Sequence, residues 1–209
     1  MRSRWGAIPL CACLALVLSP IRARAEGEEE ALAKGKKLYD EAVVLLEKKS
    51  YSEACPKLEE AVRLVPVAVG ARLALAECDE GRGKLASALS GYRKAQSMAA
   101  TTGQGEREEL AKRNADRLEK KVGTLRIEVA PGDLGLAELA IEVDGAAAAA
   151  GQAVPADSGK RTVRATAKGR AAFEQVVEVA DGKETAVAIV LAPEKAAGGG
   201  KPGGGERGG

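Results

Sequence analysis

Residues 42–61, AVVLLEKKSYSEACPKLEEA, are matched about 34 residues later by residues 76–95, AECDEGRGKLASALSGYRKA. Four pairs of positions coincide in the size of their side chains: Ala42 with Ala76, Ala54 with Ala88, Leu58 with Tyr92, and Ala61 with Ala95. Small side chains at a fixed spacing let paired helices approach closely, while the larger ones fill the seam between them. The repeat therefore predicts two successive helical hairpins.

This spacing and these residue types resemble the tetratricopeptide repeat, a helical hairpin that recurs with the same period. We expect the first helix over residues 29–49 and the second from Ser52, as its N-cap, to about Val65, where Pro66 stops it. Two repeats are fewer than the usual three, so we expect a charged helix over residues 106–122 to cap them.

The hydrophobic period changes at Gly123 from that of a helix to the alternation of half-buried strands. Alternating apolar rows begin with Leu125 and Ile127, and Asp144-Gly145 and Asp181-Gly182 are typical of hairpin turns. About six short strands at this spacing predict a small antiparallel β-sandwich.

The predicted chain is therefore of the α+β class with two domains, a short tetratricopeptide-like helical array and a β-sandwich. The array covers residues 26–122 and the sandwich residues 123–192. Residues 1–25 form a targeting signal, and residues 193–209 are Gly-rich with scattered charge. Such a composition predicts a disordered tail.

The order of these parts resembles a family of bacterial envelope proteins. Three stretches carry the resemblance: YSEACPKLEE at 51–60, LALAECDEGRG at 73–83 and GKRTVRATAKGR at 159–170. The resemblance implies a signal peptide, a short tetratricopeptide unit and a small β-sandwich of the PEGA or carboxypeptidase-regulatory-like kind.

The first 25 residues have the organisation of a secretory signal. Two arginines precede an apolar run over residues 7–18, Ser19-Pro20 breaks its helix, and Ala23-Arg24-Ala25 offers small residues for cleavage before Glu26. A lipoprotein signal modified at Cys13 is an alternative. A membrane span is another, although about twelve apolar residues are fewer than the roughly twenty that a span needs. We expect an exported protein, periplasmic or envelope-associated.

Composition and charge exclude several functions. The formal net charge is +2, and removal of a signal with four arginines and no acidic residue leaves about −2, so nucleic acid is not an expected partner. The chain has no His, which removes His-ligated metals and His-activated nucleophiles. Its paired acidic residues stand beside Lys and Arg at helical spacing, as on solvated faces. We expect no catalytic residue, metal or cofactor.

Cys55 and Cys78 are the two cysteines that remain after signal cleavage. An exported chain with an even pair permits one disulfide, and the tetratricopeptide resemblance implies that their two helices face each other. Such a disulfide would close a loop of about 22 residues and contribute about 3 kcal/mol of stability. Two thiols packed in a helical core are the alternative.

If the helices stack as in tetratricopeptide units, one concave surface gathers eight side chains. They are Lys36, Tyr39, Val43, Leu46, Glu47, Leu73, Glu77 and Glu80, with Tyr39 as the anchor. The alternative is that Tyr39 and Leu46 pack on a neighbouring helix. We expect a noncatalytic adaptor that binds an envelope protein or peptide. A cell-wall or carbohydrate-binding module centred on the sandwich is the second hypothesis, although 2% aromatic residues offer few rings for stacking on sugars.

Overall fold

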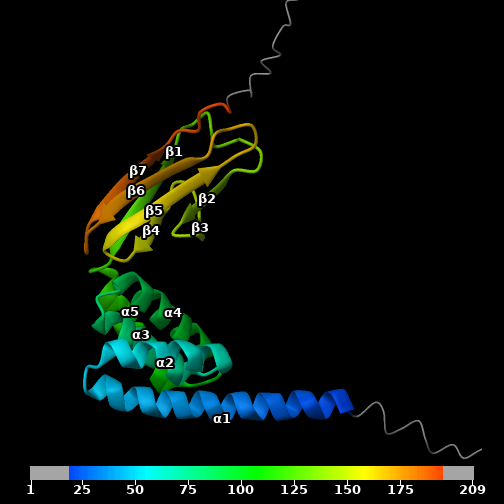
Figure 1. Ribbon diagram of the computed structural model, residues 1–209. Coiled ribbons are helices and arrows are strands. Elements are labelled where there is room, and N and C mark those ends of the chain that lie inside the picture. Colours follow the sequence, from blue (N-terminus) through cyan, green and yellow to red (C-terminus); the bar gives the residue numbers. More distant parts are fainter. Residues whose placement is uncertain (1–18, 195–209) are drawn as a thin grey trace, which may run out of the picture. The chain divides into compact units, whose positions relative to one another are not determined.

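Five helices precede seven strands in residues 19–194, which the computed structural model describes (Figure 1). The fold is of the α+β class, with two sheets following the helices. Residues 1–18 of the predicted signal 1–25, and residues 195–209 of the predicted tail 193–209, lie outside this part of the chain. Residues 19–25 of the predicted signal belong to the first helix.

The described chain forms two compact units. The helical unit runs as far as Arg82 and resumes over Ser90–Arg113, and the sheet unit comprises Gly83–Leu89 and the chain from Asn114 onward. The expected boundary at residue 122 separates helices from strands, whereas the compact units divide α4 (Leu85–Thr101) and α5 (Gly105–Glu119) between them.

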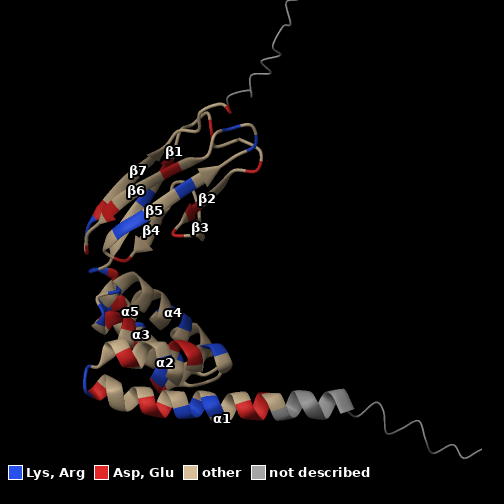
Figure 2. Cartoon of the chain, viewed as in Figure 1, with Lys and Arg blue, Asp and Glu red and all other residues tan. Residues whose placement is uncertain are grey.

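The first helix, α1 (Ser19–Glu47), begins about ten residues before the expected start at residue 29. Pro20 is its second residue, where a missing N–H costs no helical hydrogen bond. The helix ends at Glu47, because Lys49 adopts a left-handed backbone with φ of 58°. Lys, Arg, Asp and Glu are interspersed along the described part of α1 (Figure 2).

The second helix, α2 (Tyr51–Leu64), begins one residue before Ser52, so the prediction of Ser52 as N-cap is wrong. Ser50 holds that position, and its carbonyl oxygen accepts hydrogen bonds from the N–H groups of Glu53 and Ala54 at 3.1 and 3.0 Å. Pro56 lies early in the helix, and Val65 follows its end. The backbone therefore sets this helix start, without a side-chain cap.

The repeat positions are all buried. Six alanines at the coinciding positions have 0–1% of their surface exposed, and their larger partners Leu58 and Tyr92 have 0% and 3%. A Cβ at Gly91 would lie 2.9 Å from the Cβ of Ala76 on α3 (Val69–Gly81), so these helices are in direct contact. The sequence repeat therefore marks the places where the helices approach most closely.

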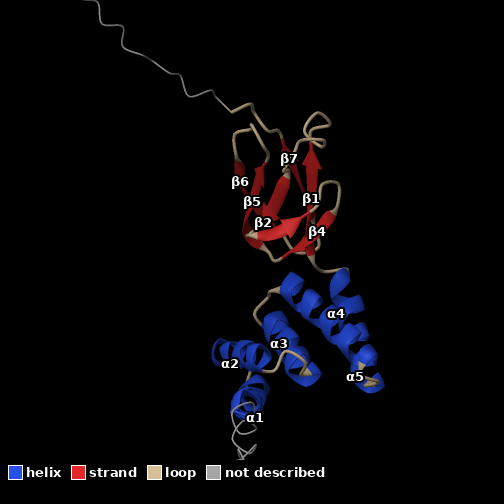
Figure 3. Cartoon of the chain, turned by 90° about the vertical axis from the view of Figure 1, so that its right-hand side faces the viewer, coloured by secondary structure: helices blue, strands red, loops and turns tan. Residues whose placement is uncertain are grey.

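The strands form two sheets (Figure 3). One has the order β4 (Ala153–Ala156), β1 (Gly123–Val129), β7 (Glu184–Ile189). The other has the order β3 (Ala146–Ala148), β2 (Ala140–Val143), β5 (Gly159–Thr166), β6 (Phe173–Val179). Apolar residues of both sheets and of the segments beside them share one buried cluster: Leu125, Ile127, Ile141, Val143, Ala156, Val163, Ala165, Val177, Val179, Val187, Ile189 and Leu191.

One strand pairing departs from the antiparallel prediction. Strands β1 and β7 are parallel, from Thr124 opposite Glu184 to Val129 opposite Ile189, whereas the other pairings of the described strands are antiparallel. A parallel pair needs a long crossover, which the intervening strands supply here.

The two predicted turns behave differently. Asp144 and Gly145 have φ of 49° and 80° and join β2 to β3, as in a hairpin. Asp181-Gly182 instead joins β6 to β7, which belong to different sheets. The hairpin prediction at Asp181-Gly182 is therefore wrong, because the chain crosses between sheets there.

An acidic side chain before β5 holds the first turn of α4 within the sheet unit. Asp157 accepts hydrogen bonds from the backbone N–H groups of Ala86 and Ser87, at 2.7 and 3.1 Å, and from the Ser87 hydroxyl at 2.6 Å. A carboxylate is favourable at a helix N-terminus, where N–H groups lack helical partners. Both partners of this contact belong to the sheet unit.

Candidate binding site on the helical unit

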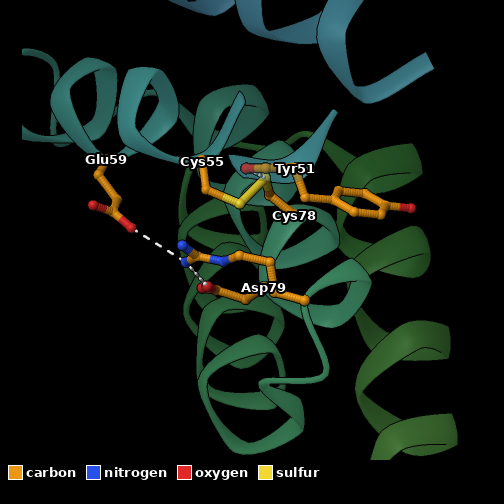
Figure 4. Close-up of a disulfide and its surroundings, with 6 residues drawn as sticks. Tyr51, Cys55, Glu59, Cys78 and Asp79 are labelled. Atoms are coloured by element: carbon orange, nitrogen blue, oxygen red, sulfur yellow. Dashed lines mark hydrogen bonds and ion pairs between the residues drawn. A yellow bond between two sulfur atoms is a disulfide. The ribbon is translucent and has the colours of Figure 1, made fainter. Parts of the chain in front are cut away.

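A disulfide joins α2 to α3. The Sγ atoms of Cys55 and Cys78 are 2.07 Å apart, their Cα atoms are 5.7 Å apart, and neither residue is exposed. Figure 4 shows the ring of Tyr51 extending to one side of the bridge and Glu59 to the other. The bridge joins the cysteine pair for which the sequence permits a disulfide, and two packed thiols are the alternative that it replaces. It closes a loop that contains the whole connection between the two helices.

The close contacts around the disulfide involve a glycine and an arginine. A side chain at Gly81 would overlap the Tyr51 ring. Arg82 at the end of α3 lies 2.7 Å from an Asp79 carboxylate oxygen and 3.3 Å from one of Glu59 on α2 (Figure 4). These contacts fix the end of α3 beside α2.

A surface hollow of about 370 Å³ lies where α1, the α2–α3 linker and the start of α5 meet. We call it the linker hollow. Its larger apolar side chains are Leu32, Tyr39, Val65, Val67 and Val69. Leu32 and Val67 keep 57% and 78% of their surface exposed, so apolar surface lines the rim as well as the floor. Exposed apolar surface around a concavity is typical of a binding site.

Glycines shape the linker hollow. A Cβ at Gly35 of α1 would lie 2.7 Å from Cγ2 of Val65, so glycine lets α1 approach the end of α2. A Cβ at Gly70 would instead project toward two polar groups, 3.6 Å from Nη2 of Arg107 and 3.8 Å from the hydroxyl oxygen of Tyr39. The absence of a side chain at residue 70 therefore leaves room between these groups.

The polar side chains of the linker hollow include two cations. Lys36 donates a 2.6 Å hydrogen bond to Asp40. Arg107 donates to the neutral amide oxygen of Gln104, and it makes no ion pair with an acidic side chain of residues 27–194. The positive charge of Arg107 is thus available at the edge of an apolar surface.

Ion pairs join the two helices that flank the linker hollow. Glu60 of α2 accepts two hydrogen bonds from Arg63 and one from Lys34 of α1, and the Arg63 guanidinium holds the pKa of this carboxyl at about 2, below the ordinary 4.5. Lys57 of α2 donates a 2.6 Å hydrogen bond to Glu41 of α1 and lowers the pKa of that carboxyl. Both carboxylates therefore stay charged at neutral pH.

The structure brings only two of the eight predicted groove residues, Lys36 and Tyr39, to the linker hollow. Tyr39 and Leu46 also pack against the cluster around the disulfide, and Leu73 packs instead against Val69, Ala95, Ala99 and Ala111. Glu80 accepts a 3.4 Å hydrogen bond from the Tyr92 hydroxyl. Val43 is half-buried, while Glu47 and Glu77 are exposed elsewhere. Leu73 is therefore turned toward α4 and α5, and the linker hollow includes two of the eight predicted residues.

The sequence analysis missed the linker and α5 as parts of the site. Val67, Gly70 and Arg107 line the linker hollow but belong to no repeat position. A signal was available in residues 65–70, VPVAVG, which place Val65 and Val67 in the connection between helices and Val69 at the start of α3. Apolar residues concentrated in a loop indicate that something covers them.

A second hollow lies in the sheet unit, at residues 147–149 and 152–155. Alanines, Val154, Pro155 and Gln152 line it, and none of these residues has an aromatic ring. Within residues 19–194 no cluster of three or more Cys, Asp or Glu side chains has the geometry of a metal site. No helix of the described chain combines the length and apolar character needed to cross a bilayer.

Comparisons with protein-family models, with curated proteins and with solved structures give no match for this chain.

Proposed function

We propose that the chain is a noncatalytic exported envelope protein that binds a protein or peptide partner through its helical unit. In this proposal α1–α4 form two tetratricopeptide-like hairpins, α5 caps them, and the two sheets form a PEGA-like β-sandwich. The burial of all eight repeat positions supports the hairpin part of the proposal. The common core of the two sheets supports the sandwich part.

The observation that carries the binding function is the linker hollow. Three elements contribute to it, it is concave, and its rim exposes Leu32 and Val67. Leaving these side chains in water forfeits the free energy that their burial would release, about 25 cal/mol per Å² of apolar surface. A partner that covers them recovers it, so the helical unit presents a surface suited to protein binding.

Export rests on the signal-like residues 1–25 and on the cysteine pair. A disulfide persists in an oxidising compartment, and the pair Cys55–Cys78 suits such a location. Intact-mass measurement on protein from its native host should give a mature chain that starts near Glu26. Recovery of cytoplasmic protein that retains Met1 would contradict export, and a lipidated Cys13 would keep export but move the processing site.

Site-specific photocrosslinking of the full chain in its native host tests the binding function. A photoreactive amino acid at residue 67 should crosslink to a discrete partner. The matched control is residue 190, also a valine and 67% exposed, but in the sheet unit. The same crosslinked species from both positions, or none from residue 67, would contradict the proposal. Sedimentation of the purified chain with cell wall in place of a protein crosslink would favour the cell-wall hypothesis.

A further inference from the structure

Two polar groups converge on the open space beside Gly70. The Tyr39 hydroxyl and the Arg107 guanidinium would each lie within 4 Å of a Cβ placed there. They come from α1 and α5, which are far apart in the sequence. Gly70 has no positive φ, so the backbone does not require glycine at this position. Its effect is to leave space between the two groups.

Both groups retain hydrogen-bonding capacity. With residues 27–194, the Tyr39 hydroxyl makes no hydrogen bond and the Arg107 guanidinium bonds only to the Gln104 amide. A guanidinium presents several donors in a planar fork that matches a carboxylate, and a tyrosine hydroxyl adds one more. The pair is therefore suited to an anionic planar group.

The surroundings of this donor pair are apolar. Val67 and Val69 approach from the linker and the start of α3, and Leu32 approaches from α1. A ligand that fits must place a large apolar side chain close to its carboxylate. Lys36 lies on the same hollow but is paired with Asp40, so Arg107 is the cation of the hollow that has no acidic partner among residues 27–194.

We infer that the linker hollow binds an extended peptide segment in which an Asp or Glu stands beside a large apolar residue. The inference rests on the proposed binding function and names the chemistry of its partner. Tyr39 and Arg107 hold the acidic side chain, and the linker valines cover the apolar one. Apolar surface at Leu32 of α1 and at Val67 of the linker fits a chain that contacts both elements.

The chain's own ends do not have this chemistry. Residues 1–18 carry two arginines and no acidic residue, and residues 195–209 contain no Leu, Ile, Val, Met or aromatic residue. The first would bring positive charge to two cations, and the second would leave the valines uncovered. Charge complementarity therefore favours a separate acidic and apolar segment.

The test uses the full mature chain and a synthetic library of heptapeptides with acetylated and amidated ends. Selected peptides should carry Asp or Glu within two positions of Leu, Ile, Phe or Trp. Their Kd, measured in solution, should rise at least tenfold with Arg107→Gln. Gly70→Ala should have a similar effect, since its methyl group would lie between the two donors.

Matched controls separate binding from folding. Arg113→Gln removes the same charge from the same helix, outside the linker hollow, and Gly105→Ala adds a methyl group with nothing within 4 Å. Neither should change Kd, and all four variants should keep the helical circular dichroism spectrum. Replacing the Asp or Glu of the peptide with Asn or Gln should raise the Kd for the unmodified chain. The same replacement should leave the Kd for the Arg107→Gln variant unchanged.

Several results would overturn the inference. Selected peptides without acidic residues, or an unchanged Kd with Arg107→Gln, would exclude carboxylate recognition. If such peptides still lose binding with Val67→Asp, the proposed binding function stands without the inference. A library with no selected peptide would reject the inference, and photocrosslinking at residue 67 would then decide the binding function separately.

Discussion

The two units of this protein bury apolar surface in different ways. The buried clusters of the helical unit are rich in alanine, and they centre on Ala42 and Ala54 beside the disulfide and on Ala95 and Ala99 beside Val69. The sheet unit has one continuous cluster, mostly of valine, isoleucine and leucine. Alanine permits close helix packing, but each alanine buries little apolar area. We therefore expect the stability of the helical unit to depend more than that of the sheet unit on close backbone packing and on a disulfide.

This difference extends to the surface. In the helical unit, larger apolar side chains such as Leu32 and Val67 remain exposed around the linker hollow. In the sheet unit, the apolar side chains on the facing sides of the two sheets bury one another in a single cluster. Large apolar side chains are exposed on the sheet unit as well, at Leu134, Val176 and Val190. What distinguishes the helical unit is that two of its exposed apolar side chains, Leu32 and Val67, line a hollow.

Truncation of a large core residue of the sheet unit should give the largest loss of stability, and the loss should be confined to that unit. Ile127 is fully buried on β1, the central strand of its sheet, so Ile127→Ala should lower the free energy of unfolding by about 4 kcal/mol. Hydrogen exchange should show this loss in β1 and β7 with little change in α2 and α3. The control Val190→Ala, at a 67% exposed residue, should cost under about 0.5 kcal/mol. Equal losses in both units would mean that they unfold together.

Removal of the disulfide should affect the helical unit instead. The double variant Cys55→Ala, Cys78→Ala should lower its free energy of unfolding by about 3 kcal/mol, because the unfolded chain regains the freedom of the loop. Tyrosine fluorescence follows this unit, since Tyr39, Tyr51 and Tyr92 all lie within it. In the unmodified exported protein, unfolded without reductant, titration should find no free thiol. Two free thiols per chain would contradict the disulfide.

One substitution should have opposite effects at two glycines of the helical unit. Gly91→Ala places a Cβ 2.9 Å from that of Ala76 and should cost about 1–3 kcal/mol through overpacking. Gly70→Ala meets only ordinary contacts and should stabilise α3 by about 0.5 kcal/mol. Thermal unfolding of both variants measures the difference. A loss of stability with Gly70→Ala would mean that the space beside Gly70 is needed for folding.

Acid should weaken the helical unit slightly more than the sheet unit. The lowered carboxyl pKa values belong to Glu41 and Glu60 in the first and to Glu184, beside Arg126, in the second. A carboxyl with a lowered pKa contributes stability above about pH 4.5 and loses it as the pH falls, for Glu60 toward about 2. The groups are exposed, so the effect is small and decreases with salt. Unfolding temperatures measured from pH 6 to pH 3 should fall, and a rise would contradict these ion pairs.

The helical repeat and the change in hydrophobic period could be predicted from the sequence, because both depend on residues close to one another along the chain. The repeat placed Ala54, Leu58 and Ala61 in a buried seam, and the change of period placed β1 at Gly123. The helix starts were predicted less well. Pro20 and Ser50 fit the first turn through their backbones, and propensity alone does not distinguish these positions from their neighbours.

Contacts between distant segments could not be predicted in the same way. The parallel pairing of β1 with β7 depends on how the whole sheet unit closes, and no residue within either strand specifies it. The linker hollow likewise combines Tyr39, Gly70 and Arg107 from three elements. Their spacing in the sequence has no period, so only the packed helices bring them together.

The photocrosslinking yield at residue 67 in a Gly70→Ala chain tests the binding role of the linker hollow most directly. The added methyl group should leave the chain at least as stable, because it meets only ordinary contacts. It should also fill the space between Tyr39 and Arg107. We predict that the partner crosslink falls at least tenfold while the unfolding temperature stays the same or rises. An undiminished crosslink in a fully folded Gly70→Ala chain would contradict partner binding between Tyr39 and Arg107 in the linker hollow.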